Sequence, residues 1–236
     1  MRNPIIFTSF NDDVDERFYH YQRKILEKLG IIQNYTYAPL KYNFHHSVML
    51  HGDVLNKFVN KIFYEQGFDA IMIIDIDCIP LSKFAVDFTF GLAYNGMLVG
   101  NIQRSSHINN NNHLYCASSF ICFTEKTYRE LGRPNFLPNY DGDTCEQLTY
   151  NAEKIELPVV AYLPTEIERP NENYELWDLG DKKFDFGLPK YGIGTTFSQQ
   201  IDDKIIPMTY HLFGSRLKQF DELFFSKCER ILSSKE

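Results

Sequence analysis

Apolar runs alternate with amphipathic segments along the first third of the chain. Residues 4–10, 31–40 and 68–75 are short, apolar and rich in β-branched and aromatic side chains, which predicts three strands. Between them, residues 11–30 and 53–67 repeat apolar side chains at helical spacing and end at a glycine, which predicts two helices. This order predicts an α/β fold with right-handed crossovers, in which a mixed, mostly parallel sheet is flanked by helices.

The pattern is looser after Pro80, but it still predicts further elements. Residues 165–200 are polar and have no clear period, so we expect them to be irregular. No repeat or linker divides the chain, and we expect one domain spanning residues 1–236. The remaining predictions are helices at 83–96, 125–132, 141–154 and 217–234, strands at 97–102, 114–124 and 157–164, and renewed order at 204–216.

Charge, cysteine usage and hydropathy narrow the classes of protein that fit this chain, although a local basic groove for nucleic acid is not excluded. The chain has 24 Lys and Arg against 31 Asp and Glu, and the net charge of −7 argues against nucleic acid as a partner. The five cysteines are scattered without zinc-site spacing, which predicts free thiols in a reducing compartment. No apolar run has the length of a membrane span. We therefore expect a soluble, cytoplasmic protein.

Two carboxylates, Asp75 and Asp77, directly follow the apolar strand predicted at 68–75. Residues two apart share one face of a regular strand, so both side chains can point at one cation. Without a positive charge nearby the two carboxylates repel one another. Oxygen ligands of this kind suit Mg²⁺ or Mn²⁺, which often bind through one or two carboxylates and substrate phosphates. Taken alone, the pair also fits a solvated strand end.

Two segments carry a resemblance to a known family. The stretch "DAIMIIDIDCIPL" at 69–81 resembles the DxD segment of the GT-A glycosyltransferases, and "YHLFGSR" at 210–216 resembles their late histidine segment. The resemblance implies a GT-A-like (Rossmann-like) catalytic domain. It further implies that residues 1–80 form a nucleotide-binding half and residues 81–236 an acceptor-binding half.

The same resemblance implies a metal and diphosphate site. Asp77 matches the acid that ligates the metal, and Asp75 matches the acid that contacts the donor ribose or reaches the metal through water. His211 matches the third protein ligand of Mn²⁺ or Mg²⁺. Gly214 would let the backbone approach the diphosphate, and Arg216 would pair with it.

Further polar residues are candidates for binding the donor. Thr8, Ser9 and Asn11 follow the first predicted strand, although Asn11 is also a candidate helix cap. The helix before the DxD strand faces the donor in these enzymes. Its candidates here are Asp53, which also fits an N-cap, and two asparagines one turn apart, Asn56 and Asn60.

The acceptor side needs a group that activates a hydroxyl. Asp143 is the first candidate for a general base and Asp141 the second, and a base role assumes an inverting reaction. Asp143 and Glu146 also fit a capping box, in which Glu146 points away from the site. The single tryptophan, Trp177, fits either a sugar-stacking surface or a core position.

These features predict a glycosyltransferase that moves a sugar from a nucleotide-sugar donor, a UDP-sugar as first choice, to a glycan or surface polysaccharide. A HAD-like phosphatase also has a DxD after an apolar strand. However, Ile79 stands where that class usually has Thr or Val, and a complete βαβα unit precedes the motif. The other alternative is a non-catalytic nucleotide- or carbohydrate-binding module.

Overall fold

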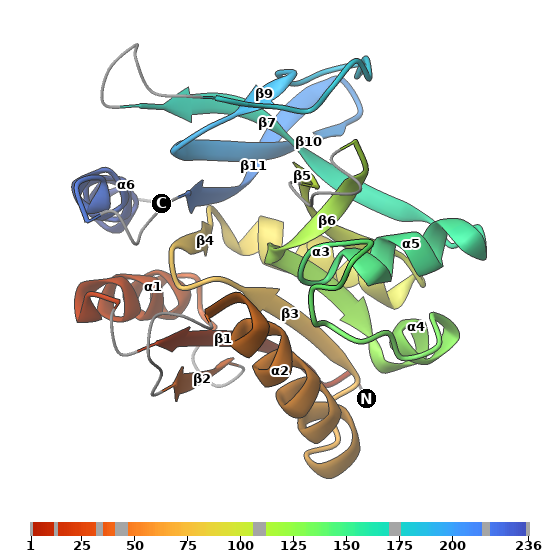
Figure 1. The fold of residues 1–236 in the computed structure, drawn as a ribbon. Helices are drawn as coiled ribbons and strands as arrows, with labels where there is room; N and C mark the ends of the chain where they lie inside the picture. Colours follow the sequence, from red (N-terminus) through yellow and green to blue (C-terminus); the bar gives the residue numbers. More distant parts are fainter. Residues whose placement is uncertain are drawn as a thin grey trace.

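The described part of the chain folds around one curled sheet of nine strands (Figure 1). The computed structural model describes residues 2–11, 14–31, 35–40, 47–105, 112–169, 176–213 and 218–234. Within these ranges the strand order is β2-β1-β3-β6-β5-β7-β10-β11-β4. The strands are β1 Pro4–Asn11, β2 Tyr35–Leu40, β3 Ala70–Ile74, β4 Cys78–Pro80, β5 Leu98–Arg104, β6 Leu114–Thr124, β7 Val159–Glu168, β10 Gly194–Ile201 and β11 Lys204–Leu212. A separate small sheet pairs β8 (Trp177–Asp178) with β9 (Lys190–Tyr191).

The predicted α/β class is confirmed, but the prediction of a mostly parallel sheet is wrong. Strand β1 runs parallel to β2 and β3, and β5 runs parallel to β7. The other five neighbouring pairs are antiparallel. The βαβ pattern that predicts parallel pairing is present only at the N-terminus, whereas hairpin-like neighbours such as β10 and β11 are antiparallel.

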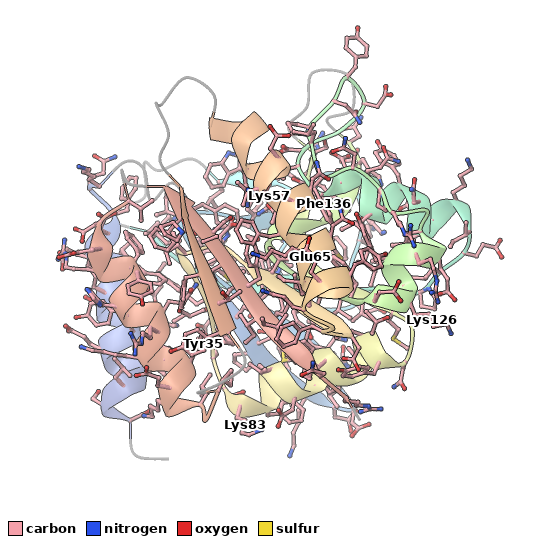
Figure 2. All side chains as sticks on the ribbon, turned by 90° about the horizontal axis from the view of Figure 1, so that it is seen from below. Tyr35, Lys57, Glu65, Lys83, Lys126 and Phe136 are labelled. Atoms are coloured by element: carbon pink, nitrogen blue, oxygen red, sulfur yellow. The ribbon has the colours of Figure 1, made fainter. Side chains whose placement is uncertain are left out.

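Helices cover both faces of the sheet. They are α1 Glu16–Lys28, α2 Ser47–Asn60 with a π-helical turn η2 at Lys61–Glu65, α3 Lys83–Tyr94, α4 Glu125–Glu130, α5 Glu146–Lys154 and α6 Asp221–Ser233. Side chains of α2, α4 and α5 share one core cluster, and those of α3 share another. Figure 2 shows Phe136 beside α2, where its backbone N–H donates to Asn56 Oδ1 at 3.0 Å.

Strand β3 is buried on both faces, as its apolar run predicts. Ile71 and Ile73 belong to the cluster under α2, whereas Met72 and Ile74 belong to the cluster under α3. Successive side chains therefore alternate between the two cores, which is the two-residue period of a strand. Because β3 is packed on both faces, the position of Asp75, which follows it directly, is fixed.

The sheet curls so that β4, the last strand in the order, comes close to β3, the third. Only residues 75–77 separate β3 from β4, although these strands are third and last in the strand order. Three residues span at most about 10 Å, so the two strands have to lie close together. Strand β7 makes the curl possible because its first half pairs with β5 and its second half with β10. Pro80 lies in β4, the edge strand, where a missing N–H is tolerated.

Two sequence predictions require correction. Asn11 ends β1, and Asp15 caps α1 by accepting a hydrogen bond from the Arg17 N–H at 2.9 Å. Residues 165–200 are not irregular throughout, because β10 crosses the sheet there.

Candidate metal centre

A tight turn carries the acid pair from β3 to β4. The Asp75 N–H donates to Ser119 O at 3.0 Å, and the Cys78 N–H donates to Asp75 O at 3.0 Å. Gln22 of α1 is fully buried, and its side-chain amide donates to both Asp75 O and Cys78 O at 2.7 Å. Asp75 and Asp77 therefore share a direction because of this turn. The pleat of a continuous strand, which predicted the same outcome, does not extend through them.

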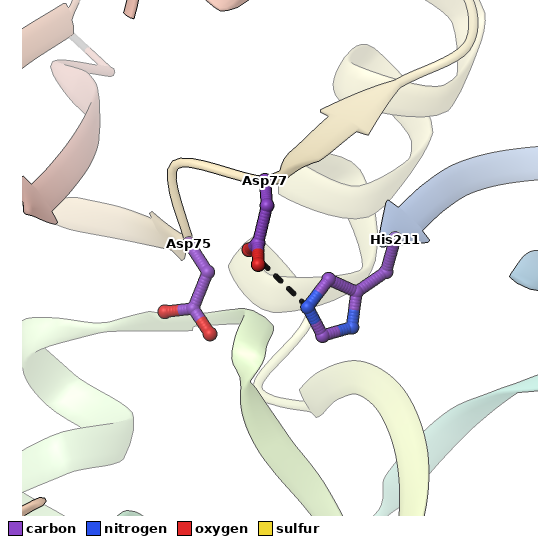
Figure 3. A group of neighbouring side chains, drawn as sticks. All are labelled: Asp75, Asp77 and His211. Atoms are coloured by element: carbon purple, nitrogen blue, oxygen red, sulfur yellow. Dashed lines mark ion pairs between the residues drawn. The ribbon is translucent and has the colours of Figure 1, made fainter. Parts of the chain in front are cut away.

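The third residue, His211, comes from the far end of the sheet. It lies on β11 directly opposite Cys78 of β4, and the Leu212 N–H donates to Asp77 O at 2.9 Å. This register places His211 Nε2 3.3 Å from Asp77 Oδ1 (Figure 3). Potential ligand atoms of Asp75, Asp77 and His211 all lie within 4.8 Å of one another. The predicted meeting of these three residues is confirmed.

The three side chains fit a divalent cation. Two ligands of one ion lie at most two bond lengths apart, about 4–5 Å for bonds of 2.0–2.6 Å. Two carboxylates and one imidazole offer the oxygen and nitrogen atoms that Mg²⁺, Mn²⁺ and related ions accept. The Asp77 and His211 side chains are largely buried, whereas the Asp75 side chain is 28% exposed. The group can therefore bind an ion that keeps one side open to a substrate.

Two buried thiols, Cys78 and Cys145, neighbour this group. Burial raises the pKa of the Cys78 thiol well above its ordinary value, and the charges of Asp77 and Asp75 raise it further. Burial also raises the pKa of Cys145, again with help from Asp75. All five cysteines are buried and free, which confirms the expected thiols.

His51 is a residue of this site that the sequence reasoning missed. Its Nε2 lies 3.6 Å from Asp75 Oδ1, and its side chain is 25% exposed. It lies in α2, which begins six residues earlier than the predicted helix. The histidine-containing stretch 45–51 is visible in the sequence, but no sequence pattern connects it with Asp75.

Two hydrogen bonds hold the Asp143 carboxylate. Its Oδ1 accepts from the Thr144 N–H at 2.7 Å, and its Oδ2 accepts from the Tyr115 hydroxyl at 3.3 Å. The charges of both Asp75 and Asp143 act on the buried Cys145 thiol. Asp141 is exposed on the short turn between Asn139 and Gly142. Both acids remain candidates for the catalytic base.

Glu146 anchors the loop that carries Asp143. Its carboxylate is fully buried and accepts from the Asp143 N–H at 2.6 Å, which is one half of the predicted capping box. The same carboxylate accepts from the Ser105 hydroxyl at 2.8 Å and lies 2.7 Å from His113 Nδ1. His113 also stacks on the Tyr150 ring at 3.9 Å. Sequence reasoning expected Glu146 to point away and did not connect it with His113.

The predicted donor-binding residues of β1 and α2 each have different neighbours. Thr8 is buried and its hydroxyl donates to Gln22 Oε1 at 3.1 Å, so it supports the acid-pair turn from behind. Ser9 is half-buried on β1, and Asp53 is exposed on α2. Asn56 bonds to the 135–136 loop, and the Asn60 amide donates to Asn56 O at 2.7 Å. Contact of any of these residues with a donor stays a prediction.

Four predicted residues remain, and the structure describes the side chain of only one of them, Trp177. The side chain of Asn11, and all of Gly214 and Arg216, lie outside the described residues. Trp177 is 39% exposed and packs against Tyr191 and Phe213, with ring centroids 5.6 and 5.4 Å away. It is therefore a packed ring with one accessible side, and its stacking on a sugar stays a prediction.

Comparisons with known proteins add little to this geometry. No family model matches the chain, and no curated protein matches it. Among solved structures, 112 chains match, including one described as the crystal structure of A197 from STIV. That protein is 12% identical, with a TM-score of 0.43, and the match covers 88% of this chain and 94% of that one. No helix in the described ranges is both long and apolar enough to cross a bilayer.

Proposed function

We propose that this protein is a metal-dependent glycosyltransferase of the GT-A type. It transfers a sugar from a nucleotide-sugar donor, a UDP-sugar as first choice, to a hydroxyl group of a glycan or surface polysaccharide. The observation that carries the proposal is the meeting of Asp75, Asp77 and His211 at one partly open site. The DxD segment and the late histidine supply this group in the order that the resemblance implies.

The residues of the site divide the work of such a transfer. A bound Mn²⁺ or Mg²⁺ supplies positive charge that stabilises a departing diphosphate. Asp77 and His211 are held by the pairing of β4 with β11, so they are preorganised for an ion. Asp75 is the most exposed of the three, and the neighbouring His51 can reach a group bound on that side.

Asp143 is our proposed general base. Its backbone position is fixed by Glu146, and its carboxylate is only partly buried. An ionised carboxylate in this position can accept the proton of an acceptor hydroxyl as the sugar is transferred. This role requires an inverting reaction, and Asp141 on the adjacent turn is the second choice.

A donor screen tests the proposed function. The full chain is incubated with UDP-, GDP-, ADP- and CMP-linked sugars and Mn²⁺, and released nucleotide is measured. We expect slow, metal-dependent hydrolysis of at least one donor, because transferases leak activated sugar to water. Asp77→Asn should abolish it, whereas Asp203→Asn, an exposed acid in the β10–β11 turn, should not.

Three results would count against the proposal. Donor binding without turnover would indicate a nucleotide-binding module. Release of inorganic phosphate from p-nitrophenyl phosphate, lost in Asp75→Asn, would favour the phosphatase alternative. Full metal-dependent activity in Asp77→Asn would remove the metal group from the mechanism.

A further inference from the structure

A polar groove of about 560 Å³ lies outside the metal group and shares His113 with the surroundings of Asp143. Its volume falls within the roughly 300–1,000 Å³ of small-molecule sites. It opens between the start of β6, the end of β5, α5 and the segment that follows β8. The charged side chains that line it are Arg104, His113, Glu153, Asp178, Asp181 and Lys182.

An aromatic cluster separates this groove from the metal group. The Phe213 ring lies 4.0 Å from the His211 ring and 5.4 Å from Trp177, which directly precedes Asp178 in the groove wall. Tyr191 lies 5.0 Å from Phe213 and accepts a hydrogen bond from the backbone of Arg104, another wall residue. The charge of Asp143 also acts on Tyr191. The groove and the metal group thus adjoin one set of rings.

The charges of the groove are balanced. Its lining holds three acids, two permanent cations and one histidine. Several of them already have partners, since Lys190 Nζ lies 3.8 Å from Asp178 Oδ2 and His113 Nε2 lies 3.2 Å from Glu153 Oε2. A phosphate-rich ligand needs an excess of positive charge, which this lining does not offer. A neutral ligand with many hydroxyls can instead donate to the carboxylates and accept from the cations.

An accessible aromatic ring, Trp177, lies next to Asp178 of the groove wall. Trp177 keeps 39% of its surface exposed beside Asp178, while Tyr191 and Phe213 hold its position. Such a ring combines an apolar face with a polar edge, which suits the C–H face of a sugar ring. Hydroxyl-binding side chains and an adjacent indole together describe a carbohydrate site.

We propose that this groove binds a neutral oligosaccharide, and that it holds the acceptor during sugar transfer. The second part rests on the proposed function, whereas carbohydrate binding does not. The sugar chain lies along the segment 178–182 with one end at Trp177. That end is directed past the aromatic cluster towards Asp143 and the metal group.

Saturation-transfer NMR on the full chain tests the groove without metal or donor. The probes are maltotriose, mannotriose and chitotriose, with trehalose 6-phosphate as an anionic sugar. We expect binding of at least one neutral trisaccharide, weakened at least about tenfold by Asp181→Ala combined with Lys182→Ala. Both side chains are exposed, so the double variant should fold. The matched control, Asp203→Ala with Lys204→Ala, changes an equally exposed Asp-Lys pair outside the groove and should bind normally.

The outcomes separate this proposal from the proposed function. Trisaccharide binding that persists in Asp77→Asn supports the groove even if no donor is hydrolysed. Equal binding by the 181–182 double variant and its control would overturn the proposal. Absence of binding for all three neutral probes, or preference for the phosphorylated sugar, would overturn it as well.

Discussion

At the scale of single residues, the acid pair depends on a side chain that no motif marks. Gln22 is buried in α1, and its amide holds the two carbonyls that bracket the turn, at Asp75 and Cys78. The side-chain carbonyl of Gln22 accepts a hydrogen bond from the Thr8 hydroxyl. Asp75, Asp77 and His211 could be predicted because their order resembles a known motif. Gln22 and His51 could not, because their roles arise from contacts between residues far apart in sequence.

Replacing Gln22 tests this support. Gln22→Leu removes the amide group that bonds to the Asp75 and Cys78 carbonyls and to the Thr8 hydroxyl, so we expect the free energy of unfolding to fall by about 1–3 kcal/mol. Mn²⁺ affinity should fall as well, because the turn loses its anchor. Urea unfolding and a metal titration measure the two effects.

Thr8→Val provides the graded control for that experiment. It removes one hydrogen bond of the same network and should cost only about 0.5–1.5 kcal/mol. If Gln22→Leu unfolded at the wild-type urea concentration and bound Mn²⁺ normally, Gln22 would not support the site.

At the scale of elements, the apolar strands and amphipathic helices could be predicted, but a hydroxyl-rich strand could not. Thr195 and Ser198 of β10 are buried, yet they carry no hydrophobic signal. Their burial is tolerated where hydroxyls find partners, as when Thr195 Oγ1 donates to Gly192 O at 2.7 Å. Ser198 and Thr165 likewise form a hydrogen bond of 2.6 Å across to β7. Only the folded sheet supplies these partners.

The contact between α5 and the start of β6 should depend on pH. Burial alone lowers the pKa of His113, but hydrogen bonds and charges from Glu146 and Glu153 outweigh it, so the pKa is raised above its ordinary 6.5. A raised pKa in the folded state stabilises the fold below pH 6.5. This contribution is lost as the pH rises through the folded-state pKa.

The matched variant for this pH dependence is His113→Gln. Its stability deficit relative to the wild type should be larger at about pH 5.5 than at about pH 8. Urea unfolding midpoints at the two pH values measure the difference. A deficit that is constant or grows with pH would contradict the raised pKa of His113.

At the scale of the whole molecule, the curl of the sheet creates the site. β3 and β4 are consecutive in the chain, yet β4 pairs with β11 at the far end of the strand order. The metal group therefore joins the third strand of this order to its last two, β11 and β4. Strand order depends on pairing between distant segments, so the local pattern that predicted most elements could not predict the antiparallel majority or the curl.

Hydrogen exchange can detect this connection. A bound ion ties residues 75–77 to β11, so Mn²⁺ or Mg²⁺ should slow exchange of the Cys78 and Leu212 amides, which bond to Asp75 O and Asp77 O. Amides of α4, which begins beside Asp69 at the opposite end of β3 from Asp75, should change little. Because Mn²⁺ is paramagnetic, mass spectrometry is the suitable readout. Equal slowing across the chain, or none at Cys78 and Leu212, would contradict a local metal link.

The most direct test of the central claim is a titration with Mn²⁺ followed by electron paramagnetic resonance of the free ion. The wild-type chain and Asp203→Asn should each bind one ion at the Asp75, Asp77 and His211 group. Asp77→Asn and His211→Gln should each weaken binding by at least about tenfold. Equal binding by all four proteins, or no binding by the wild type, would show that these three residues do not form a metal site.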